Sequence, residues 1–286
     1  MPELPEVETI RSDLDKKIRG KIIKNVEVKK PKMVDSKSAA FVNNLLNQEI
    51  LKVKRRGKLL IIHLSSGKYL LIHLKMTGQL VYEEKGNIIV GGHSQGNDIK
   101  SLPNKYSHII FKFKEGSVLY FNDMRQFGYA RIVNNDELSD IVTRYGIEPL
   151  TDDFIFDKFK NIFKNRKTSV KAVLLNQQLI SGIGNIYADE ILFLAGVKPN
   201  RKAYSLSLAE KRKMYIATNR IIKFAIKHRG TTFNDYVDTD GKKGGFLKKL
   251  KVFGRKGEKC ARCKDGIIQK IKVAQRGTHF CNKCQY

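Results

Sequence analysis

The sequence lacks the features of a membrane or exported protein. Its longest apolar runs, such as LLII at 59–62, are far too short to span a bilayer. The first ten residues, MPELPEVETI, contain three glutamates where a secretory signal is basic and then apolar. The chain also has no P-loop, no HExxH motif and no Ser-His-Asp arrangement. We therefore expect a cytoplasmic protein that does not associate with membranes.

Acidic residues are scarce. The 286 residues include 28 acids against 55 lysines and arginines, which gives a formal charge of +27. Residues 201–286 hold 23 basic and 6 acidic side chains, whereas residues 1–200 hold 32 and 22. A hydrophobic content of 41% indicates a folded chain and not a disordered basic tail. Composition alone leaves open a solvated lysine surface, but it favours a nucleic-acid partner.

Cysteine is confined to the last 27 residues of the chain. Two CxxC pairs, Cys260/Cys263 and Cys281/Cys284, are separated by 17 residues. Each pair can present two thiolates on one tight turn, so the spacing indicates a tetrahedral zinc site. The alternative of two disulfides suits an exported protein. Two short β-rich runs lie between the pairs, and we expect one structural Zn²⁺ on a β-hairpin.

Hydrophobic periodicity divides the rest of the chain. Apolar residues at spacings of three and four predict a helix over 5–19. From 21 to 133 the pattern changes to β-rich runs separated by turn residues, which predicts a β-sandwich or barrel with flanking helices. The segment 84–105 is predicted as a long surface loop, and its GGHSQG stretch receives no function.

After a linker at 148–153 the period becomes helical. The predicted helices cover 152–164, 168–179, 185–195 and 208–228, the last opened by the capping box SLAE at 207–210. Two glycines, Gly182 and Gly184, directly precede the third helix. Free backbone N–H groups at such a turn can bind a phosphate, although a plain helix–helix turn is the more frequent explanation of the pattern.

The amino terminus carries the most unusual chemistry. If Met1 is removed, Pro2 becomes a terminal secondary amine, and an α-amino group titrates near pH ~8. Attack of this amine on an aldehyde-level carbon gives an iminium, a cationic electron sink suited to elimination. Glu3 beside it can exchange protons. Taken alone, the same residues also describe an ordinary helix start with favourable acids.

Eight segments in chain order resemble one known family. They are MPELPEVET at 1–9, RRGK at 55–58, HLKMTG at 73–78, NDMRQFG at 122–128, GIGNIYADE at 182–190, TTFNDYVDTDGKKGGF at 231–246, VFGRKGEKC at 252–260 and AQRGTHFC at 274–281. Together they resemble bacterial formamidopyrimidine-DNA glycosylase from the first residue almost to the last. The sister family of the endonuclease VIII type usually opens with MPEGPE, so Leu4 favours the purine-lesion branch.

The resemblance implies an α+β multidomain fold. We expect a catalytic β-sandwich domain over 1–148, a helix–two-turn–helix domain over 149–250 and a zinc finger over 251–286. It also implies a monomer that acts on double-stranded DNA with oxidised purines or abasic sites. Such an enzyme excises 8-oxoguanine and formamidopyrimidines, and then cleaves the strand by β,δ-elimination through a Schiff base on the terminal proline.

The resemblance assigns the catalytic residues by position. Pro2 would attack C1′ of the lesion sugar, and Glu3 would act as the acid/base at the sugar ring. Lys58 would transfer protons in β-elimination, and Arg276 would grip the flanking phosphates and assist δ-elimination. Glu6 joins this set as the residue that holds the helix start and local water.

The same resemblance assigns DNA contacts. Met76 would replace the everted base, Arg125 would bind the widowed cytosine and Phe127 would wedge the opposite strand. Residues 231–246 would close over the everted base. Phosphate-side positions are His73, Tyr106, His108, Arg166, Lys171 and Asn185. Tyr106 departs from the family, because many relatives have histidine there, and a phenol donates one hydrogen bond without carrying charge.

Two competing interpretations remain open at this stage. One is an endonuclease VIII-like preference for oxidised pyrimidines. The other is a zinc-finger protein that binds damaged DNA without chemistry. Pro2, Glu3 and Lys58 together argue against the second, because phosphate binding requires none of them.

Overall fold

The computed structural model describes residues 1–35, 37–92, 101–231 and 245–286. The chain forms two compact units, and each consists of two stretches of sequence. Unit 1 comprises 1–143 and 228–247, and unit 2 comprises 144–227 and 248–286. The expected three-part division at 148/149 and 250/251 stays a prediction.

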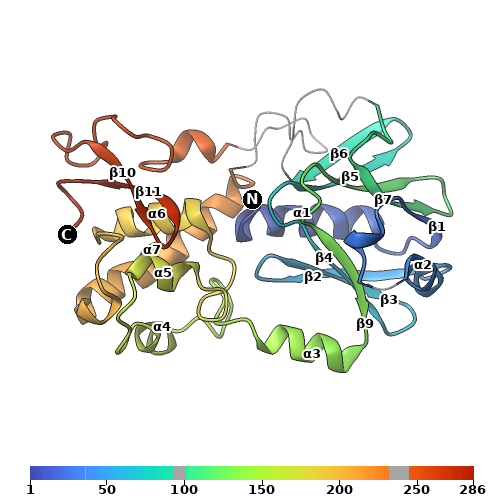
Figure 1. The fold of residues 1–286 in the computed structure, drawn as a ribbon, viewed down its shortest axis with the longest axis horizontal. Helices are drawn as coiled ribbons and strands as arrows, with labels where there is room; N and C mark the ends of the chain where they lie inside the picture. The colour runs from blue at the N-terminus through green and yellow to red at the C-terminus, as the bar shows by residue number, and fades with distance from the viewer. Residues whose placement is uncertain (36, 93–100, 232–244) are drawn as a thin grey trace. The chain divides into compact units, whose positions relative to one another are not determined.

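Unit 1 contains two antiparallel sheets (Figure 1). The first has the strand order β1 (Ile23–Val28), β7 (Ser107–Phe113), β8 (Val118–Asp123), β5 (Gly78–Glu84) and β6 (Asn87–Gly92). The second has the order β2 (Ile50–Arg56), β3 (Leu59–Leu64), β4 (Tyr69–His73) and β9 (Tyr129–Val133). The predicted sandwich and nearly all of its strands are confirmed.

One apolar core joins these sheets to two helices of unit 1. Helix α1 (Leu4–Ile18) contributes Val7, Ile10, Leu14 and Ile18, and α2 (Ser38–Leu45) contributes Phe41 and Leu45. The inward-facing residues of both sheets complete the same cluster. A third helix, α3 (Asn135–Thr143), buries no residue. The core therefore fixes the first turn of α1 against the sandwich.

One prediction about the segment 84–105 is wrong. Residues 87–92 form β6, which pairs with β5 in a regular antiparallel register. The glycine content that suggested a loop has a steric reason here, because a Cβ on Gly91 would lie 2.8 Å from Cγ1 of Ile10. The rest of the GGHSQG stretch, residues 93–96, lies outside the described residues.

Unit 2 combines helices with a hairpin. The helices are α4 (Phe156–Ile162), α5 (Val170–Leu175), α6 (Asn185–Ala195) and α7 (Leu208–Lys227), and the hairpin strands are β10 (Ile268–Val273) and β11 (Arg276–Cys281). The first two helices are shorter than predicted. The capping box of α7 is confirmed, because Ser207 Oγ accepts from Glu210 N at 3.2 Å and Glu210 Oε2 accepts from Ser207 N at 2.8 Å.

Candidate active site and nucleic-acid contacts

The start of α1 buries two carboxylates beside the amino terminus. Glu3 is 2% exposed and Glu6 is 3% exposed. Glu6 Oε2 accepts the backbone N–H of Glu3 at 2.9 Å, as part of a reciprocal capping box. The positive end of the helix dipole stabilises both acids at this position. The first turn of α1 therefore fixes the position of Glu3, the predicted acid/base.

The terminal amine lies among charged groups. In the described chain this amine belongs to Met1, and burial lowers its pKa. The charges of Glu3 and Glu6 raise that pKa, and the charge of Lys58 lowers it. Lys58 is buried at the turn between β2 and β3, directly after Gly57 with φ +55°. The amino terminus, Glu3 and Lys58 thus lie in one part of unit 1, where burial lowers the proton affinity of the Met1 amine. Pro2 is buried directly beside it.

Glu6 connects α1 to the segment that follows residue 227. Its Oε1 accepts from Thr231 N at 2.6 Å and from Thr231 Oγ1 at 3.0 Å. A Cβ on Gly230 would lie 2.5 Å from the same oxygen, so only glycine fits there. The sequence placed Glu6 at the helix start but gave no sign of this second contact. Residues 232–244, most of the predicted capping loop, lie outside the described residues.

The predicted void-filling side chains reach the surface of unit 1. Phe127 is 54% exposed, Arg125 is exposed, and the Arg125 guanidinium lies 4.8 Å from the centroid of the Phe127 ring. Met76 is half-buried in the turn after β4. Exposed apolar and cationic side chains on short turns are suited to entering a gap in a base stack.

His73 is held as a neutral donor. Its Nδ1 accepts the backbone N–H of Lys75 at 3.0 Å, so the ring proton resides on Nε2. Burial, together with the charges of Lys75 and Lys58, lowers the pKa of His73 to about 3. The ring stacks on Tyr129 at 5.7 Å. This arrangement suits a hydrogen bond to phosphate without a charge on the ring.

His108 does not fit the predicted DNA contact. It is only 2% exposed, and its Nε2 lies 2.8 Å from the carbonyl oxygen of Asp123, to which it donates. Burial lowers the pKa of His108, so the remaining nitrogen Nδ1 is an acceptor and repels a phosphate oxygen. His108 instead supports the turn after β8. Tyr106 is half-buried, and its hydrogen bond to a phosphate stays a prediction.

Lys171 also requires a correction. Its side chain is 0% exposed and forms an ion pair with Asp189 at 2.6 Å. The same ammonium donates to Thr278 Oγ1 at 2.8 Å and to the carbonyl of Gly277 at 3.4 Å. An ammonium enclosed in this way has no surface to offer a phosphate. Lys171 instead ties α5 and α6 to the tip of the zinc hairpin.

The other predicted contacts of unit 2 gather at that hairpin tip or remain exposed. Asn185 Nδ2, at the start of α6, donates to the carbonyl of Gly277 at 3.1 Å. Its Oδ1 is buried without a hydrogen-bond partner in the described part of the chain. Arg276 is exposed at the start of β11. Arg166 is exposed, and its Nε donates to the carbonyl of Ile162 at 2.6 Å.

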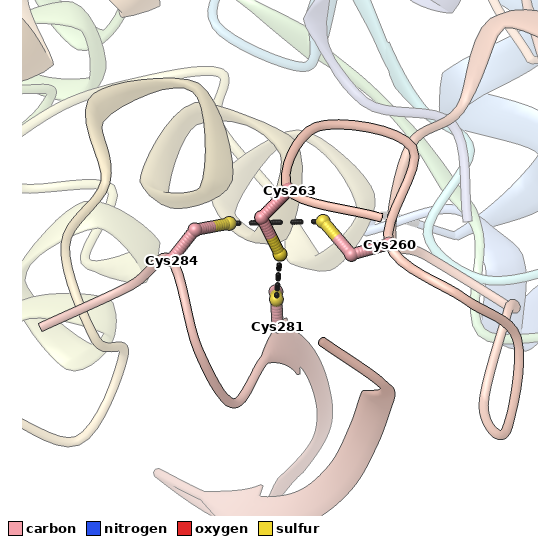
Figure 2. Close-up of side chains that lie close together, drawn as sticks. All are labelled: Cys260, Cys263, Cys281 and Cys284. Carbon is pink, nitrogen blue, oxygen red and sulfur yellow. Dashed lines mark hydrogen bonds between the residues drawn. The ribbon is translucent and has the colours of Figure 1, made fainter. Parts of the chain in front are cut away.

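Figure 2 shows the four cysteines with their sulfur atoms turned toward one another. The four Sγ atoms all lie within 4.8 Å, and the Cys260–Cys284 and Cys263–Cys281 sulfurs are each 3.7 Å apart. A tetrahedron with Zn–S bonds of about 2.3 Å has edges of about 3.8 Å, whereas a disulfide measures about 2.05 Å. The donor set therefore fits one zinc ion.

The backbone around these sulfurs supports a thiolate cluster. Burial raises the pKa of Cys260, but backbone N–H groups of Cys263 and Arg262 outweigh it and lower that pKa to about 7. A Cβ on Gly266 would lie 2.4 Å from Cys281 Sγ, so glycine is required at this turn. Four thiolates fill the coordination shell, and the role of the metal is structural.

No described helix is both long and apolar enough to cross a membrane.

Comparisons with known proteins agree along the whole chain. The family descriptions that match are the formamidopyrimidine-DNA glycosylase N-terminal domain over 1–130, the formamidopyrimidine-DNA glycosylase H2TH domain over 145–237 and the zinc finger found in FPG and IleRS over 257–285. Formamidopyrimidine-DNA glycosylase of Carboxydothermus hydrogenoformans is 42% identical over 286 residues, which cover all of both chains.

Solved structures give the same result. The Lactococcus lactis Fpg complex with abasic-site DNA superimposes with a TM-score of 0.88 at 33% identity, covering 99% of each chain. The complex of a mutant of the same Lactococcus lactis protein with Fapy-dG-containing DNA gives a TM-score of 0.87 with the same identity and coverage.

Proposed function

The chain belongs to the formamidopyrimidine-DNA glycosylase family, and we propose that it repairs oxidised purines in duplex DNA with Pro2 as the nucleophile. It is a bifunctional glycosylase and abasic-site lyase that binds one structural zinc ion. The observation that carries the residue assignment is the position of the amino terminus, which interacts electrostatically with the buried side chains of Glu3, Glu6 and Lys58.

The first step is displacement of the base. The neutral nitrogen of Pro2 attacks C1′, the C1′–N9 bond breaks, and its electron pair and a proton go to the leaving purine. Glu3 exchanges protons with the sugar, which the capping geometry allows because its carboxylate is fixed at the helix start. The nitrogen then loses its N–H proton, Glu3 protonates O4′, and the C1′–O4′ bond breaks. This ring opening leaves an iminium between Pro2 and C1′.

Strand cleavage follows from the iminium. Loss of a proton from C2′ expels the 3′ phosphate, and loss of a second proton from C4′ expels the 5′ phosphate. Lys58 moves these protons. Support for this role comes from its charge, which lowers the pKa of both the Met1 amine and His73. Hydrolysis of the enamine-derived adduct then releases Pro2 with its nitrogen unchanged.

DNA contacts divide between the two units. In unit 1, His73 and Tyr106 donate to phosphates, and Met76, Arg125 and Phe127 enter the gap left by the base. In unit 2, Asn185, Arg166 and Arg276 bind phosphates. Support comes from the exposed positions of Arg125, Phe127, Arg166 and Arg276.

Borohydride trapping tests the mechanism. With Met1 removed, the protein should form a covalent adduct with an abasic-site duplex in the presence of borohydride. Absence of an adduct would favour a DNA-binding protein without chemistry. Pro2→Gly leaves a primary amine, which should react more slowly and still be trapped.

Substrate choice is tested by comparing two lesions. We expect faster release of 8-oxoguanine opposite cytosine than of thymine glycol. The opposite order would assign an endonuclease VIII-like preference.

We propose that this reaction takes place in the bacterial cytoplasm, with the protein on the nucleoid while it is bound to DNA. The bacterial origin of the relatives supports this location. A carboxy-terminal fluorescent fusion that spreads evenly and never coincides with DNA after oxidative damage would contradict it.

A further inference from the structure

The end of β8 buries a carboxylate that the reaction itself does not use. Asp123 is 0% exposed. Its Oδ1 accepts from the hydroxyl of Thr77 and from the backbone N–H of Arg125, the latter at 3.1 Å. Its Oδ2 accepts from the backbone N–H of Gly128 at 2.7 Å. One side chain therefore satisfies donors from two separate turns.

These donors belong to the backbone that presents the void-filling side chains. Thr77 directly follows Met76, Arg125 contributes its own N–H, and Gly128 directly follows Phe127. The hydroxyl of Thr77 also accepts from Arg125 N at 3.1 Å, which closes a small network between the two turns. The spacing between Met76 and the Arg125–Phe127 turn is thus set through Asp123.

The backbone of Asp123 extends this network to a phosphate-side position. Its carbonyl accepts from His108 Nε2 at 2.8 Å, and its N–H donates to the carbonyl of Tyr106 at 3.0 Å. The turn before β7, which carries Tyr106, is therefore tied to the same residue. His108 therefore acts inside the protein, where it holds the Asp123 backbone, and does not contact DNA directly.

The carboxylate has little freedom to move. A Cβ on Gly128 would lie 3.0 Å from Asp123 Oδ2 and 2.7 Å from Cζ of Phe121, so glycine is needed for the close approach. The turn at Arg125–Phe127 also contains Gln126 at φ +55°, a conformation that a side chain rarely adopts without support. The Asp123 carboxylate supports this conformation, because it accepts backbone N–H groups from Arg125 before Gln126 and from Gly128 after it.

We propose that Asp123 is a positioning residue that holds Met76, Arg125 and Phe127 in the spacing needed to replace the everted base and read the opposite cytosine. The proposal rests on the proposed function. Its consequence is that Asp123 governs base excision and opposite-base discrimination more than it governs elimination at a site that has already lost its base.

Asp123→Asn tests this with little change in size. The amide keeps one acceptor oxygen but directs an NH₂ group against at least one N–H or O–H donor that now bonds to oxygen. Single-turnover excision of 8-oxoguanine opposite cytosine should fall about tenfold or more. The preference for cytosine over adenine opposite the lesion should shrink, while cleavage of a preformed abasic site should fall less than threefold.

Two further variants separate positioning from general stability. Thr77→Val removes one donor and should give a smaller loss in the same direction. Ser117→Ala removes a buried hydroxyl at the opposite end of β8 and should keep wild-type discrimination. All variants are compared at a temperature well below their unfolding transitions.

The outcomes distinguish a failure of the Asp123 positioning role from a failure of the proposed function. If Asp123→Asn keeps wild-type discrimination, or if Ser117→Ala loses it equally, the positioning role is wrong. If the wild-type protein excises no 8-oxoguanine, the proposed function fails instead.

Discussion

At the scale of single residues, the nitrogen of Pro2 distinguishes a glycosylase and lyase from a DNA-binding protein without chemistry. An amino-terminal extension that stays attached converts this amine into an amide, which has no nucleophilic lone pair. We expect such a protein to lose borohydride trapping and strand cleavage to the level of a reaction without enzyme. The same extension placed after Tyr286 should leave both intact. Full cleavage by the amino-terminally extended protein would exclude the amine mechanism.

His73 gives a second prediction at this scale. The pKa of His73 in the folded protein is about 3, below the ordinary value of 6.5. Between these two pH values the unfolded chain binds a proton at His73 and the folded chain does not. The contribution of His73 to the free energy of unfolding is therefore fully present above pH 6.5 and is lost as the pH falls toward 3. Between pH 7.5 and 5.5 this residue should cost about 1.4 kcal/mol of unfolding free energy.

Urea unfolding of the zinc-loaded protein at several pH values measures this loss. His73→Gln should flatten the pH dependence by the same amount, whereas a mutant curve parallel to the wild-type curve would contradict it. His108, whose pKa is also lowered by burial, contributes in the same direction and remains present in both proteins.

Residue matching predicts a catalytic set from the sequence but does not report burial. Pro2, Glu3 and Lys58 follow from short motifs because chemistry fixes their residue types. Lys171 and His108 match such motifs equally well, and the structure encloses both of them. The difference lies in partners distant in sequence, Asp189 for Lys171 and Asp123 for His108, which no local pattern reveals.

At the scale of elements, the buried Lys171–Asp189 pair joins α5 and α6 to the hairpin tip. Lys171→Met would leave the Asp189 carboxylate buried without its counter-ion, and we expect a loss of about 3–5 kcal/mol in unfolding free energy. Lys171→Met combined with Asp189→Asn should recover much of that loss, because the uncompensated charge is gone. Thermal unfolding of the three proteins measures the difference. Equal stability of the single and double variants would contradict this account.

The missed elements have a common physical explanation. Alternating apolar residues predicted most strands of the sandwich. The predicted bounds of α6 agree with the structure, where Gly196, at φ +74°, ends the helix. Helices α2 and α3 span only 8 and 9 residues, shorter than the window of about 11–18 residues over which helical periodicity is read. Strand β6 contains glycines at 91 and 92, and its pairing with β5 outweighs their low strand propensity.

At the scale of the whole molecule, the charge of +27 predicts DNA binding that depends strongly on salt. The logarithm of affinity for an abasic-analogue duplex should fall linearly with the logarithm of salt concentration. Arg276→Ala should reduce the slope by about 1, because it removes one phosphate contact. Lys114→Ala, an exposed cation on the turn between β7 and β8, is the control and should leave the slope unchanged. Equal slopes for Arg276→Ala and the wild type would remove Arg276 from the interface.

The contact between Glu6 and Thr231 also has a consequence for biosynthesis. The two residues are 225 positions apart, so at about 5–20 residues per second a ribosome needs roughly 10 to 45 s to make the second after the first. Throughout that interval the nascent helix start lacks the donors that Thr231 will supply. A polypeptide released early, even one with every strand of the sandwich, would leave the ribosome without the hydrogen bonds from Thr231 to Glu6.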